Sequence, residues 1–254
     1  MTLMGKDTDE LVIAASEYAN SVPLTRFIRA VCPAARVVNE PPSCTAALLI
    51  EGRADAALVP VASALRQDAL AVVPGIGVCA RHAVRSVLLK CRRPVERIRS
   101  VAADPASCTS NALARIILHR RYGQRIEMRT PGAGGEADAE VMIGDRALHE
   151  PPAPCGDLDL AAEWHALTGR PFVCAVWACR AGDPRQGRIA RILSQARKAG
   201  VKALPQLAAS ESERLGLPLA QCLDYFRNCI YYEVGLEEEE AMQRFGEMMI
   251  EENA

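Results

Sequence analysis

The sequence predicts an α/β protein in which short strands alternate with helices. Two observations support this prediction. Short apolar runs recur along the chain between segments with helical patterning, and three of the connections that lead into a helix are rich in Ser, Thr or Asn. Alternation of this kind favours an open sheet whose ligands bind outside the carboxyl ends of the strands. We therefore expect the polar connections to converge on one cleft.

Composition limits the function classes. The chain has 254 residues, half of them apolar, which is enough for two lobes or one large domain. The net charge is −1, with 30 Lys and Arg against 31 Asp and Glu, so a nucleic-acid partner is not expected. The ten cysteines are scattered singly and form no zinc-type spacing, which predicts a reducing compartment and no metal.

Targeting and membrane segments are not expected. The first apolar run, residues 11–15, is too short and too far from the N-terminus for a signal peptide. No stretch approaches the ~20 consecutive apolar residues that cross a bilayer. The sequence therefore predicts a soluble, cytoplasmic protein that has no membrane partner.

The first half of the chain contains two of the polar connections. Apolar runs predict strands at residues 11–15, 36–40, 56–60, 70–78 and 84–90. Asn20 and Ser21 precede a helix that has Pro23 just inside its start, a common N-terminal pattern. Ser43 and Thr45 stand at the start of a second helix, which ends near residue 52. Asn20 either hydrogen-bonds its own connection or faces a ligand.

The third polar connection is the richest in hydroxyl groups. A strand at residues 101–103 leads into a helix that begins near Ser107, Thr109 and Ser110. One cap needs a single hydroxyl, and the free N–H groups at a helix start suit a carboxylate or phosphate. The alternative is a helix with more caps than it needs. Ser86 lies between apolar neighbours in its predicted strand. Its hydroxyl is either hydrogen-bonded within the protein or a second polar group of the cleft.

The second half of the chain continues the pattern. Strands are expected at residues 125–129, 139–143 and 172–179, and helices at 187–200 and 219–232. The Gly-rich stretch 130–136 lacks the spacing of a dinucleotide or P-loop motif and is predicted to be a loop, like residues 149–157.

Six blocks, in the same order, resemble the chorismate dehydratases, the MqnA family of the futalosine route to menaquinone. The blocks are 18–24 (YANSVPL), 42–60 (P-S followed by G-x-x-D-x-A-L-x-P), 86–87 (SV), 104–110 (DPASCTS), 143–148 (IGDRAL) and 159–177 (DLAAEWHALTGRPFVCAVW). The last block is the most specific, and the resemblance extends from residue 11 to about residue 180. The sequence departs from the family pattern at Val61-Ala62 and over Cys79 to His82.

The resemblance implies a two-lobed, periplasmic-binding-protein-like (type II) fold with mixed sheets flanked by helices and the ligand cleft between the lobes. We expect lobe 1 at residues 1–90 and 181–254 and lobe 2 at residues 91–180. The implied reaction eliminates water from chorismate to give 3-[(1-carboxyvinyl)oxy]benzoate. No cofactor or metal is implied, the small-molecule substrate is chorismate, and monomer and homodimer both remain open.

Residue roles follow from the same resemblance and from the chemistry of the substrate. Asn20 and Ser86 are the expected catalytic residues. The expected substrate-binding residues are Ser21, Ser43, Thr45, Ser107, Thr109 and Ser110. The proton is expected to pass to a substrate carboxylate, with His82 as the alternative base. Glu163, Trp164 and Trp177 are expected to pack in the core.

Two other functions remain open at this point. One is the sister enzyme, a 1,4-dihydroxy-6-naphthoate synthase of the same fold, which the Glu163-Trp164 block disfavours. The other is a non-catalytic cytoplasmic binding protein for an aromatic carboxylate. A solute receptor of a transporter would normally need an export signal.

Overall fold

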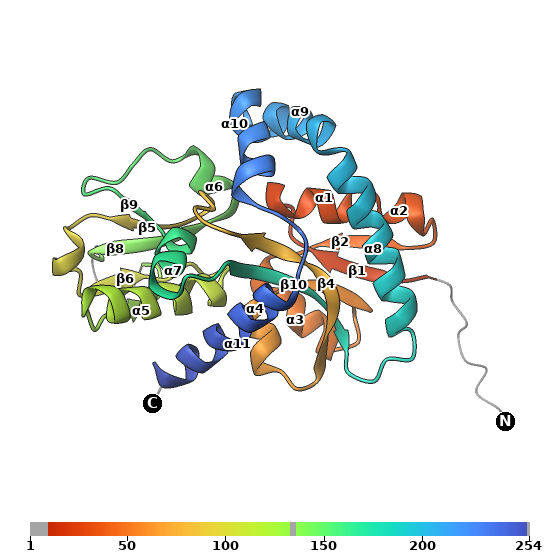
Figure 1. The fold of residues 1–254 in the computed structure, drawn as a ribbon, viewed down its shortest axis with the longest axis horizontal. Helices are drawn as coiled ribbons and strands as arrows, with labels where there is room; N and C mark the ends of the chain where they lie inside the picture. Colours follow the sequence, from red (N-terminus) through yellow and green to blue (C-terminus); the bar gives the residue numbers. More distant parts are fainter. Residues whose placement is uncertain (1–9, 133–135, 253–254) are drawn as a thin grey trace.

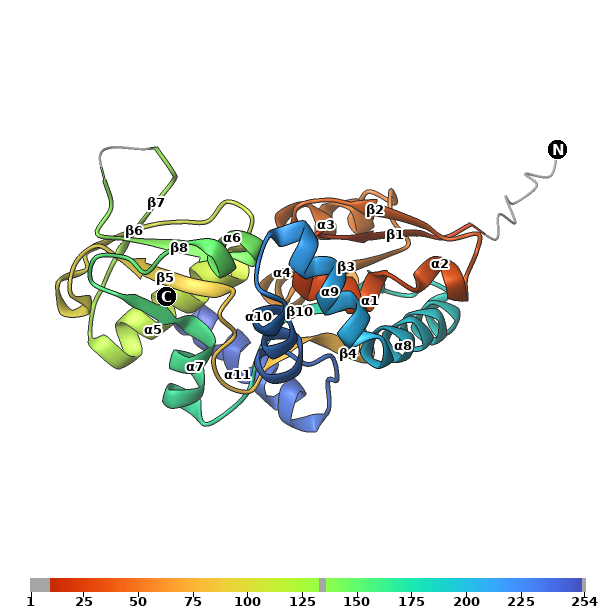
Figure 2. The same cartoon turned by 90° about the horizontal axis from the view of Figure 1, so that it is seen from above.

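A computed structural model describes residues 10–132 and 136–252. Two mixed five-stranded sheets lie side by side, and helices flank both of them (Figure 1). The view from above shows strand β10 and helices α4 and α10 near the junction between the two halves (Figure 2).

The first sheet, sheet 1, has the strand order β2-β1-β3-β10-β4. Its strands are β1 (Val12–Ala15), β2 (Arg36–Asn39), β3 (Ala56–Pro60), β4 (Leu70–Ala80) and β10 (Phe172–Arg180). β1 pairs in parallel with β2 and β3, whereas β10 runs antiparallel between β3 and β4. Each strand coincides with an apolar run of the sequence, and β3 is buried along its whole length because neighbouring strands cover both its edges.

The second sheet, sheet 2, has the strand order β7-β6-β8-β5-β9. Its strands are β5 (Val87–Cys91), β6 (Ser100–Ala102), β7 (Glu127–Arg129), β8 (Ala139–Ile143) and β9 (Asp157–Asp159). β9 begins at the end of the segment predicted to be a loop, and it has no apolar run to identify it. Within the Gly-rich stretch, residues 133–135 lie outside the described part of the chain.

Eleven α-helices occupy the described residues. They are α1 (Val22–Thr25), α2 (Ile28–Val31), α3 (Pro42–Ile50), α4 (Val61–Arg66), α5 (Cys108–Tyr122), α6 (Gly144–His149), α7 (Leu160–Thr168), α8 (Gln186–Lys202), α9 (Leu204–Leu215), α10 (Leu219–Asp224) and α11 (Leu236–Glu251). A 3-10 turn, η1 (Ala19–Ser21), precedes α1, and another, η2 (Val95–Arg97), precedes β6. The predicted helix starts near Ser21, Ser43 and Ser107 are confirmed.

Two predicted elements end or begin elsewhere. The helix expected over 219–232 continues from α10 as a π-helical turn (Tyr225–Cys229) and stops there. Tyr231 then pairs with Cys79 through both backbone hydrogen bonds, so residues 230–232 are extended. The strand expected from residue 84 begins at Val87, because the N–H groups of Val84 and Arg85 donate to the Asp159 carboxylate and not to a strand.

The sheets divide the chain at different points from the expected lobe boundaries. β5 belongs to sheet 2 although residues 87–90 were expected in lobe 1, and β10 belongs to sheet 1 although it was expected in lobe 2. Both strands are apolar runs next to a crossing between sheets, and an apolar run does not reveal which sheet it joins. The chain crosses from sheet 1 to sheet 2 between Ala80 and Val87, and it returns between Asp159 and Phe172.

The C-terminal helix α11 joins the two halves. Its Phe245 ring packs edge-on against Phe172 of β10 at 5.5 Å and against Trp164 of α7 at 5.8 Å. Just beyond the helix, the Glu252 carboxylate accepts hydrogen bonds from His119 and Arg120 of α5. Trp164 and Trp177 are fully buried, so their predicted packing role is confirmed.

Candidate functional site

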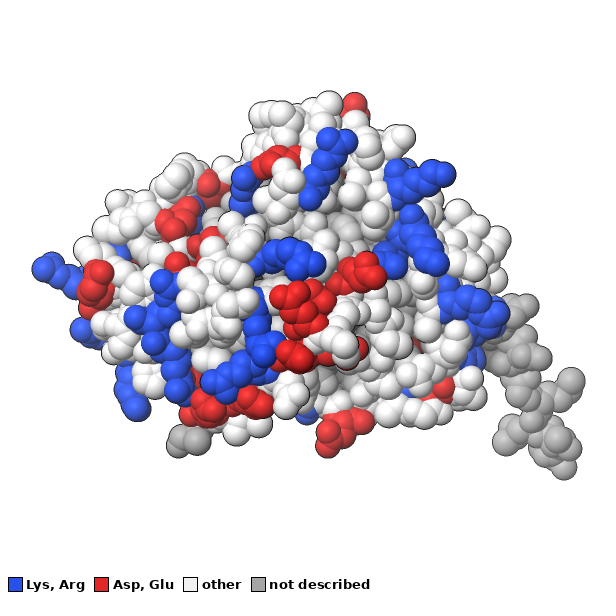
Figure 3. All heavy atoms as spheres, viewed as in Figure 1, with Lys and Arg blue, Asp and Glu red and all other residues white. Residues whose placement is uncertain are grey.

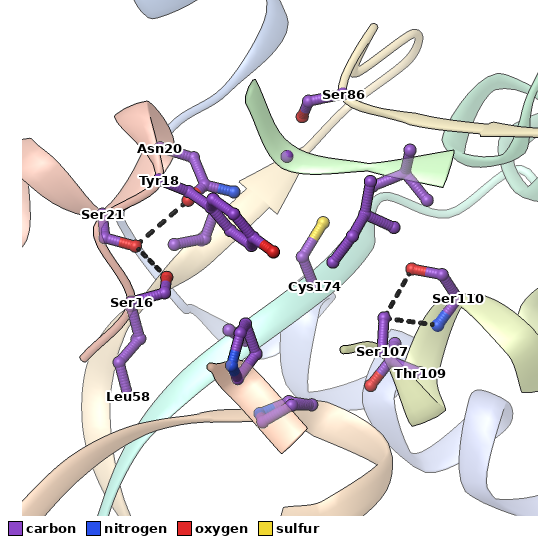
Figure 4. Close-up of a pocket in the computed structure, with 17 residues that line it drawn as sticks. Ser16, Tyr18, Asn20, Ser21, Leu58, Ser86, Ser107, Thr109, Ser110 and Cys174 are labelled. Atoms are coloured by element: carbon purple, nitrogen blue, oxygen red, sulfur yellow. Dashed lines mark hydrogen bonds between the residues drawn. The ribbon is translucent and has the colours of Figure 1, made fainter. Parts of the chain in front are cut away.

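A cavity lies where the two sheets meet. It encloses about 540 Å³ of space free of protein atoms, part of it open to solvent. Its wall comes from both sheets and from the connections that follow them (Figure 4): Ser16, Tyr18, Asn20, Ser21, Pro42, Leu58, Pro60, Val78, Ser86, Val87, Ser107, Thr109, Ser110, Ile143, Gly144, Cys174 and Ala175.

The cavity lies at the carboxyl ends of several strands. Ser16 directly follows β1, Pro60 ends β3 and Ile143 ends β8. Of the three polar connections expected to converge, the polar side chains of two reach this edge, and those of the connection with Ser43 and Thr45 do not. Of the eight predicted site residues, six line the cavity: Asn20, Ser21, Ser86, Ser107, Thr109 and Ser110.

Five helices begin at the wall. Ser21, Pro60 and Ser107 are the N-caps of α1, α4 and α5, and Pro42 and Gly144 are the first residues of α3 and α6. The first N–H groups of a helix have no acceptor within the helix and carry partial positive charge. Some of these N–H groups are already bonded, for example Ala62 to Thr109 and Gly144 to Ser86, so an anion can be held only by those that remain, chiefly at the longer helices α3 and α5.

The hydroxyl groups at the start of α5 have separate tasks. Ser107 caps the helix, because its Oγ accepts from the Ser110 N–H at 3.1 Å while its hydroxyl donates to Ser110 Oγ at 2.8 Å. Thr109 Oγ1 accepts from the N–H of Ala62 at 3.0 Å. That bond joins α5 to the first turn of α4, so Thr109 connects the halves of the molecule at the cavity wall.

On the opposite wall, the hydroxyl groups hold the Asn20 side chain. Ser16 Oγ and Ser21 Oγ lie 2.9 Å apart, and the Ser21 hydroxyl donates to Asn20 Oδ1 at 3.1 Å. The amide oxygen is therefore engaged, and the amide nitrogen is left to face the cavity (Figure 4). Asn20 is thus hydrogen-bonded within its own connection through Oδ1. Its amide nitrogen remains available to a ligand in the cavity.

Ser86 faces the cavity just before β5. Its hydroxyl lies 2.8 Å from the hydroxyl of Tyr225 in the π-helical turn, and both side chains are buried. Ser86 is thus a satisfied hydroxyl that also lines the cavity. Burial raises the pKa of Tyr225, which therefore stays protonated in its pairing with Ser86.

Three candidate residues lie away from the cavity. Ser43 is exposed on α3, and Thr45 is buried beneath the same helix, where its hydroxyl donates to the Pro42 carbonyl. His82 is exposed and stacks edge-on against His165, with ring centroids 4.3 Å apart. None of the three lines the cavity. In the case of Ser43 and Thr45 the reason is that a helix turns successive side chains to different sides, so only Pro42 of this connection reaches the wall.

The departures from the family pattern also lie off the wall. Val61 and Ala62 are buried in the first turn of α4, and Cys79 pairs through its backbone with Tyr231. Neither segment lines the cavity. The two segments can therefore affect a ligand in the cavity only indirectly, through the residues that line it.

Most of the exposed wall surface is apolar, and its polar groups are not ionised. None of the described residues that line it is Lys, Arg, His, Asp or Glu. Burial, with the nearby carboxylates of Asp104 and Asp145, raises the pKa of Tyr18. Burial, with Asp159, raises the pKa of Cys174 to about 12. Both groups remain protonated at neutral pH, so the described wall offers donors and no base.

Sequence reasoning missed eleven of the seventeen wall residues, and four of these are of interest for binding or shape. The four are Ser16, Tyr18, Gly144 and Cys174. Tyr18 and Gly144 stand inside two of the motif blocks, so their position beside Asn20 and Ile143 was an available signal. Cys174 lies within a continuous apolar run, where nothing distinguishes a wall residue from a core residue.

Three further properties of the described residues concern metal ligands, membrane-spanning helices and surface charge. In the described ranges 10–132 and 136–252, no cluster of three or more His, Cys, Asp or Glu is arranged to hold a metal ion. No helix in the described part of the chain is long and apolar enough to span a bilayer. Basic and acidic side chains are interspersed on the face in Figure 3, with no continuous basic surface there.

Comparison with known proteins gives the family. The sequence profile of a family described as "Menaquinone biosynthesis" matches residues 11–251. A curated chorismate dehydratase of Thermus thermophilus is 31% identical over 242 residues, which cover 87% of this chain and 89% of that protein. A second, from Campylobacter jejuni, is 30% identical over 171 residues, covering 67% of this chain and 65% of that protein.

Comparison with solved structures gives the fold. The periplasmic aliphatic sulphonate binding protein SsuA of Escherichia coli superposes with a TM-score of 0.65 at 16% identity, covering 96% of this chain and 92% of that one. The predicted periplasmic-binding-protein-like fold is confirmed. With a profile match over nearly its whole length and relatives at about 30% identity, this chain belongs to the menaquinone biosynthesis family.

Proposed function

We propose that this protein is a chorismate dehydratase, a hydro-lyase that converts chorismate to 3-[(1-carboxyvinyl)oxy]benzoate. The observation that supports it most directly is a cavity whose wall has many neutral donors, five helix starts and no ionised side chain among the described residues. The curated relatives are chorismate dehydratases, and they favour this function over the sister enzyme and over a binding protein.

The two carboxylates of chorismate match the two polar walls. The start of α5, with Ser107, Thr109 and Ser110, is suited to one carboxylate through backbone N–H and hydroxyl donors. The opposite wall, with Asn20, offers donors for the other end of the substrate. We propose that sheets 1 and 2 belong to two lobes that hold the substrate between them. The strands of each sheet, and not the residue ranges expected from the sequence, then define the two lobes.

The reaction breaks a C–H bond on the ring carbon that bears the ether and a C–O bond to the neighbouring hydroxyl. A C=C bond forms, the ring becomes aromatic, and the proton and hydroxide leave as water. Tyr18 and Cys174, the ionisable groups of the described wall, are protonated. We therefore propose that a carboxylate of the substrate takes the proton and that the protein supplies the orientation.

Asn20 and Ser86 are placed to assist charge development. Loss of the proton moves negative charge toward the ring carboxylate, and departure of the hydroxyl group places charge on its oxygen. Donors aimed at those atoms bind the transition state more tightly than the ground state. Asn20 Nδ2 and the Ser86 hydroxyl are candidate donors on the wall.

The test is incubation of the purified protein with chorismate, without added metal or cofactor, and analysis of the products by chromatography and mass spectrometry. The expected product is lighter than chorismate by one water. The Ser107→Ala/Thr109→Ala double variant should lower kcat/KM roughly 100-fold or more, because it removes the cap of α5, the bond from Thr109 to α4 and the Thr109 hydroxyl near the proposed carboxylate.

The matched control is Ser210→Ala, which removes an exposed hydroxyl on α9 and should leave the rate unchanged. Tight binding of chorismate without turnover would replace the proposal with a binding protein. If the protein neither bound nor turned over chorismate, the proposal would be contradicted outright.

A further inference from the structure

The Tyr18 hydroxyl is a polar group of the cavity that has no hydrogen-bond partner among the described residues. Tyr18 lines the wall and is half-buried. Its ring reaches from the connection after β1 toward the middle of the cavity, on the side where Cys174 lies (Figure 4). A half-buried hydroxyl with no internal partner is placed to bond water or a ligand.

The ring position is fixed by contact with the other half of the molecule. A Cβ atom at Gly144 would lie 2.9 Å from Cδ1, Cε1 and Cζ of Tyr18, so the ring rests where a side chain would otherwise be. Gly144 also has a φ of +68°, a conformation that other residues adopt with strain. Because Gly144 begins α6 beside sheet 2, the Tyr18 hydroxyl is held between the two halves.

The other polar side chains of this wall form hydrogen bonds with one another. Ser16 and Ser21 share a hydrogen bond, and Ser21 donates to Asn20 Oδ1. The donors left for a ligand are therefore Asn20 Nδ2 and the Tyr18 hydroxyl. In Figure 4 these two groups lie on one side and Ser107 and Ser110 on the other.

A carboxylate at this wall would need neutral donors, because no Lys, Arg or His lines the described wall. A phenol supplies one only while it is protonated. Burial and the carboxylates of Asp104 and Asp145 both raise the pKa of Tyr18, so the hydroxyl keeps its proton through the physiological range.

We propose that the Tyr18 hydroxyl donates a hydrogen bond to the substrate carboxylate that lies away from the start of α5, with Asn20 Nδ2 as the second donor. This inference rests on the proposed function, because it assigns the second carboxylate of that substrate. Tyr18 thereby selects two-carboxylate ligands over ligands that have only one. Gly144 acts as a positioning residue, since it leaves room for the ring.

The test uses the Tyr18→Phe variant, which keeps the ring and removes only the hydroxyl. Steady-state turnover of chorismate is measured, together with binding of two probes: the two-carboxylate product and benzoate. Because the hydroxyl is proposed to donate to a charged carboxylate, its removal should lower product affinity by about 10- to 100-fold and raise KM by a comparable factor. We assign the ring carboxylate to the start of α5, so benzoate, which has only that carboxylate, should bind within about two-fold of wild type.

Tyr122→Phe is the matched control, because its hydroxyl donates to Glu163 outside the cavity. It should leave both probes and KM unchanged. A Tyr18→Phe variant whose product affinity equals that of wild type would overturn the inference, as would an equal loss for both probes. If the wild-type protein fails to consume chorismate, the proposed function fails instead, so the two failures are distinguishable.

A second variant tests the positioning role. Gly144→Ala should displace the Tyr18 ring and weaken product binding in the same direction. In that background, adding Tyr18→Phe should cause little further loss, because the hydroxyl has already left its place. Full additivity of the two losses would show that Gly144 does not act through Tyr18.

Discussion

Ser86 and Tyr225 show how a single hydroxyl is held at the cavity. Their oxygens are 2.8 Å apart, and Tyr225 reaches Ser86 from the π-helical turn, far away along the chain. Because both side chains are buried, neither can exchange this bond for one to bulk water without moving. The Ser86 hydroxyl is therefore pre-oriented before any ligand arrives.

We expect Ser86→Ala to lower kcat by roughly 10-fold or more, because it removes a donor at the reacting end of the substrate. Tyr225→Phe should have a smaller effect, since it leaves the Ser86 hydroxyl present but free to rotate. Single-turnover kinetics of both variants, with thermal midpoints as a check on folding, measure the difference. Equal turnover for Ser86→Ala and wild type would remove Ser86 from the mechanism.

At the residue scale, local sequence identified the groups that lie directly at a strand-to-helix connection. Asn20, Ser21 and Ser107 belong to this class, and each lines the cavity. The partner of Ser86 was not predictable, because Tyr225 is distant along the chain and stands in a plain apolar helical stripe. Thr45 was misassigned because its helix rotates it into the core.

Helices α8 and α1 touch at a glycine. A Cβ atom on Gly200 would lie 1.8 Å from the Pro23 carbonyl oxygen and 2.6 Å from the carbonyl carbon. Pro23 belongs to the short helix that follows Asn20 and Ser21. This backbone contact therefore supports the wall of the cavity from behind.

We expect Gly200→Ala to destabilise the protein by about 3 kcal/mol or more, because backbone atoms cannot yield as a flexible side chain can. Gly187→Ala in the same helix is the matched control. Its Cβ meets nothing within 4 Å, so it should be neutral or stabilising by about 0.5–1 kcal/mol. Urea unfolding of both variants gives the comparison, and similar midpoints would contradict the close packing.

At the element scale, the amphipathic pattern of residues 187–200 predicted α8, and the capping residues near Ser107 predicted α5. Periodicity did not identify the short helices α4 and α6, which contain too few residues to show a pattern. The end of the helix at Cys229 was also not predictable. The pairing of Tyr231 with Cys79 overrides the apolar stripe there.

Across the whole molecule, α11 connects elements of both sheets through Phe245. We expect Phe245→Ala to cost about 3–5 kcal/mol, because a fully buried ring leaves a cavity next to Trp164 and Phe172. Phe27→Ala, which removes a ring only partly buried, should cost less. Denaturant unfolding followed by tryptophan fluorescence reports the difference. Equal costs would mean that α11 does not join the two halves.

The two-sheet arrangement itself was predictable only through the family resemblance. Apolar runs located nearly all the strands, but the expected lobe boundaries separated β5 and β10 from the sheets that they join. Partner choice depends on where the chain crosses between halves, and the crossing segments near residues 81–86 and 160–171 have no composition that distinguishes them.

The position of β10 has a consequence for how the protein is made. β10 fills the place between β3 and β4, yet residues 81–171 separate it from β4 in the sequence. On the ribosome, the N-terminal strands emerge long before the strand that completes their sheet, so β3 and β4 keep open edges while sheet 2 is still being synthesised. The nascent chain therefore cannot complete the sheet 1 half of its cavity until about residue 180 is free, whereas the strands of sheet 2 are all available by residue 159. The open edges of β3 and β4 need protection from aggregation until then.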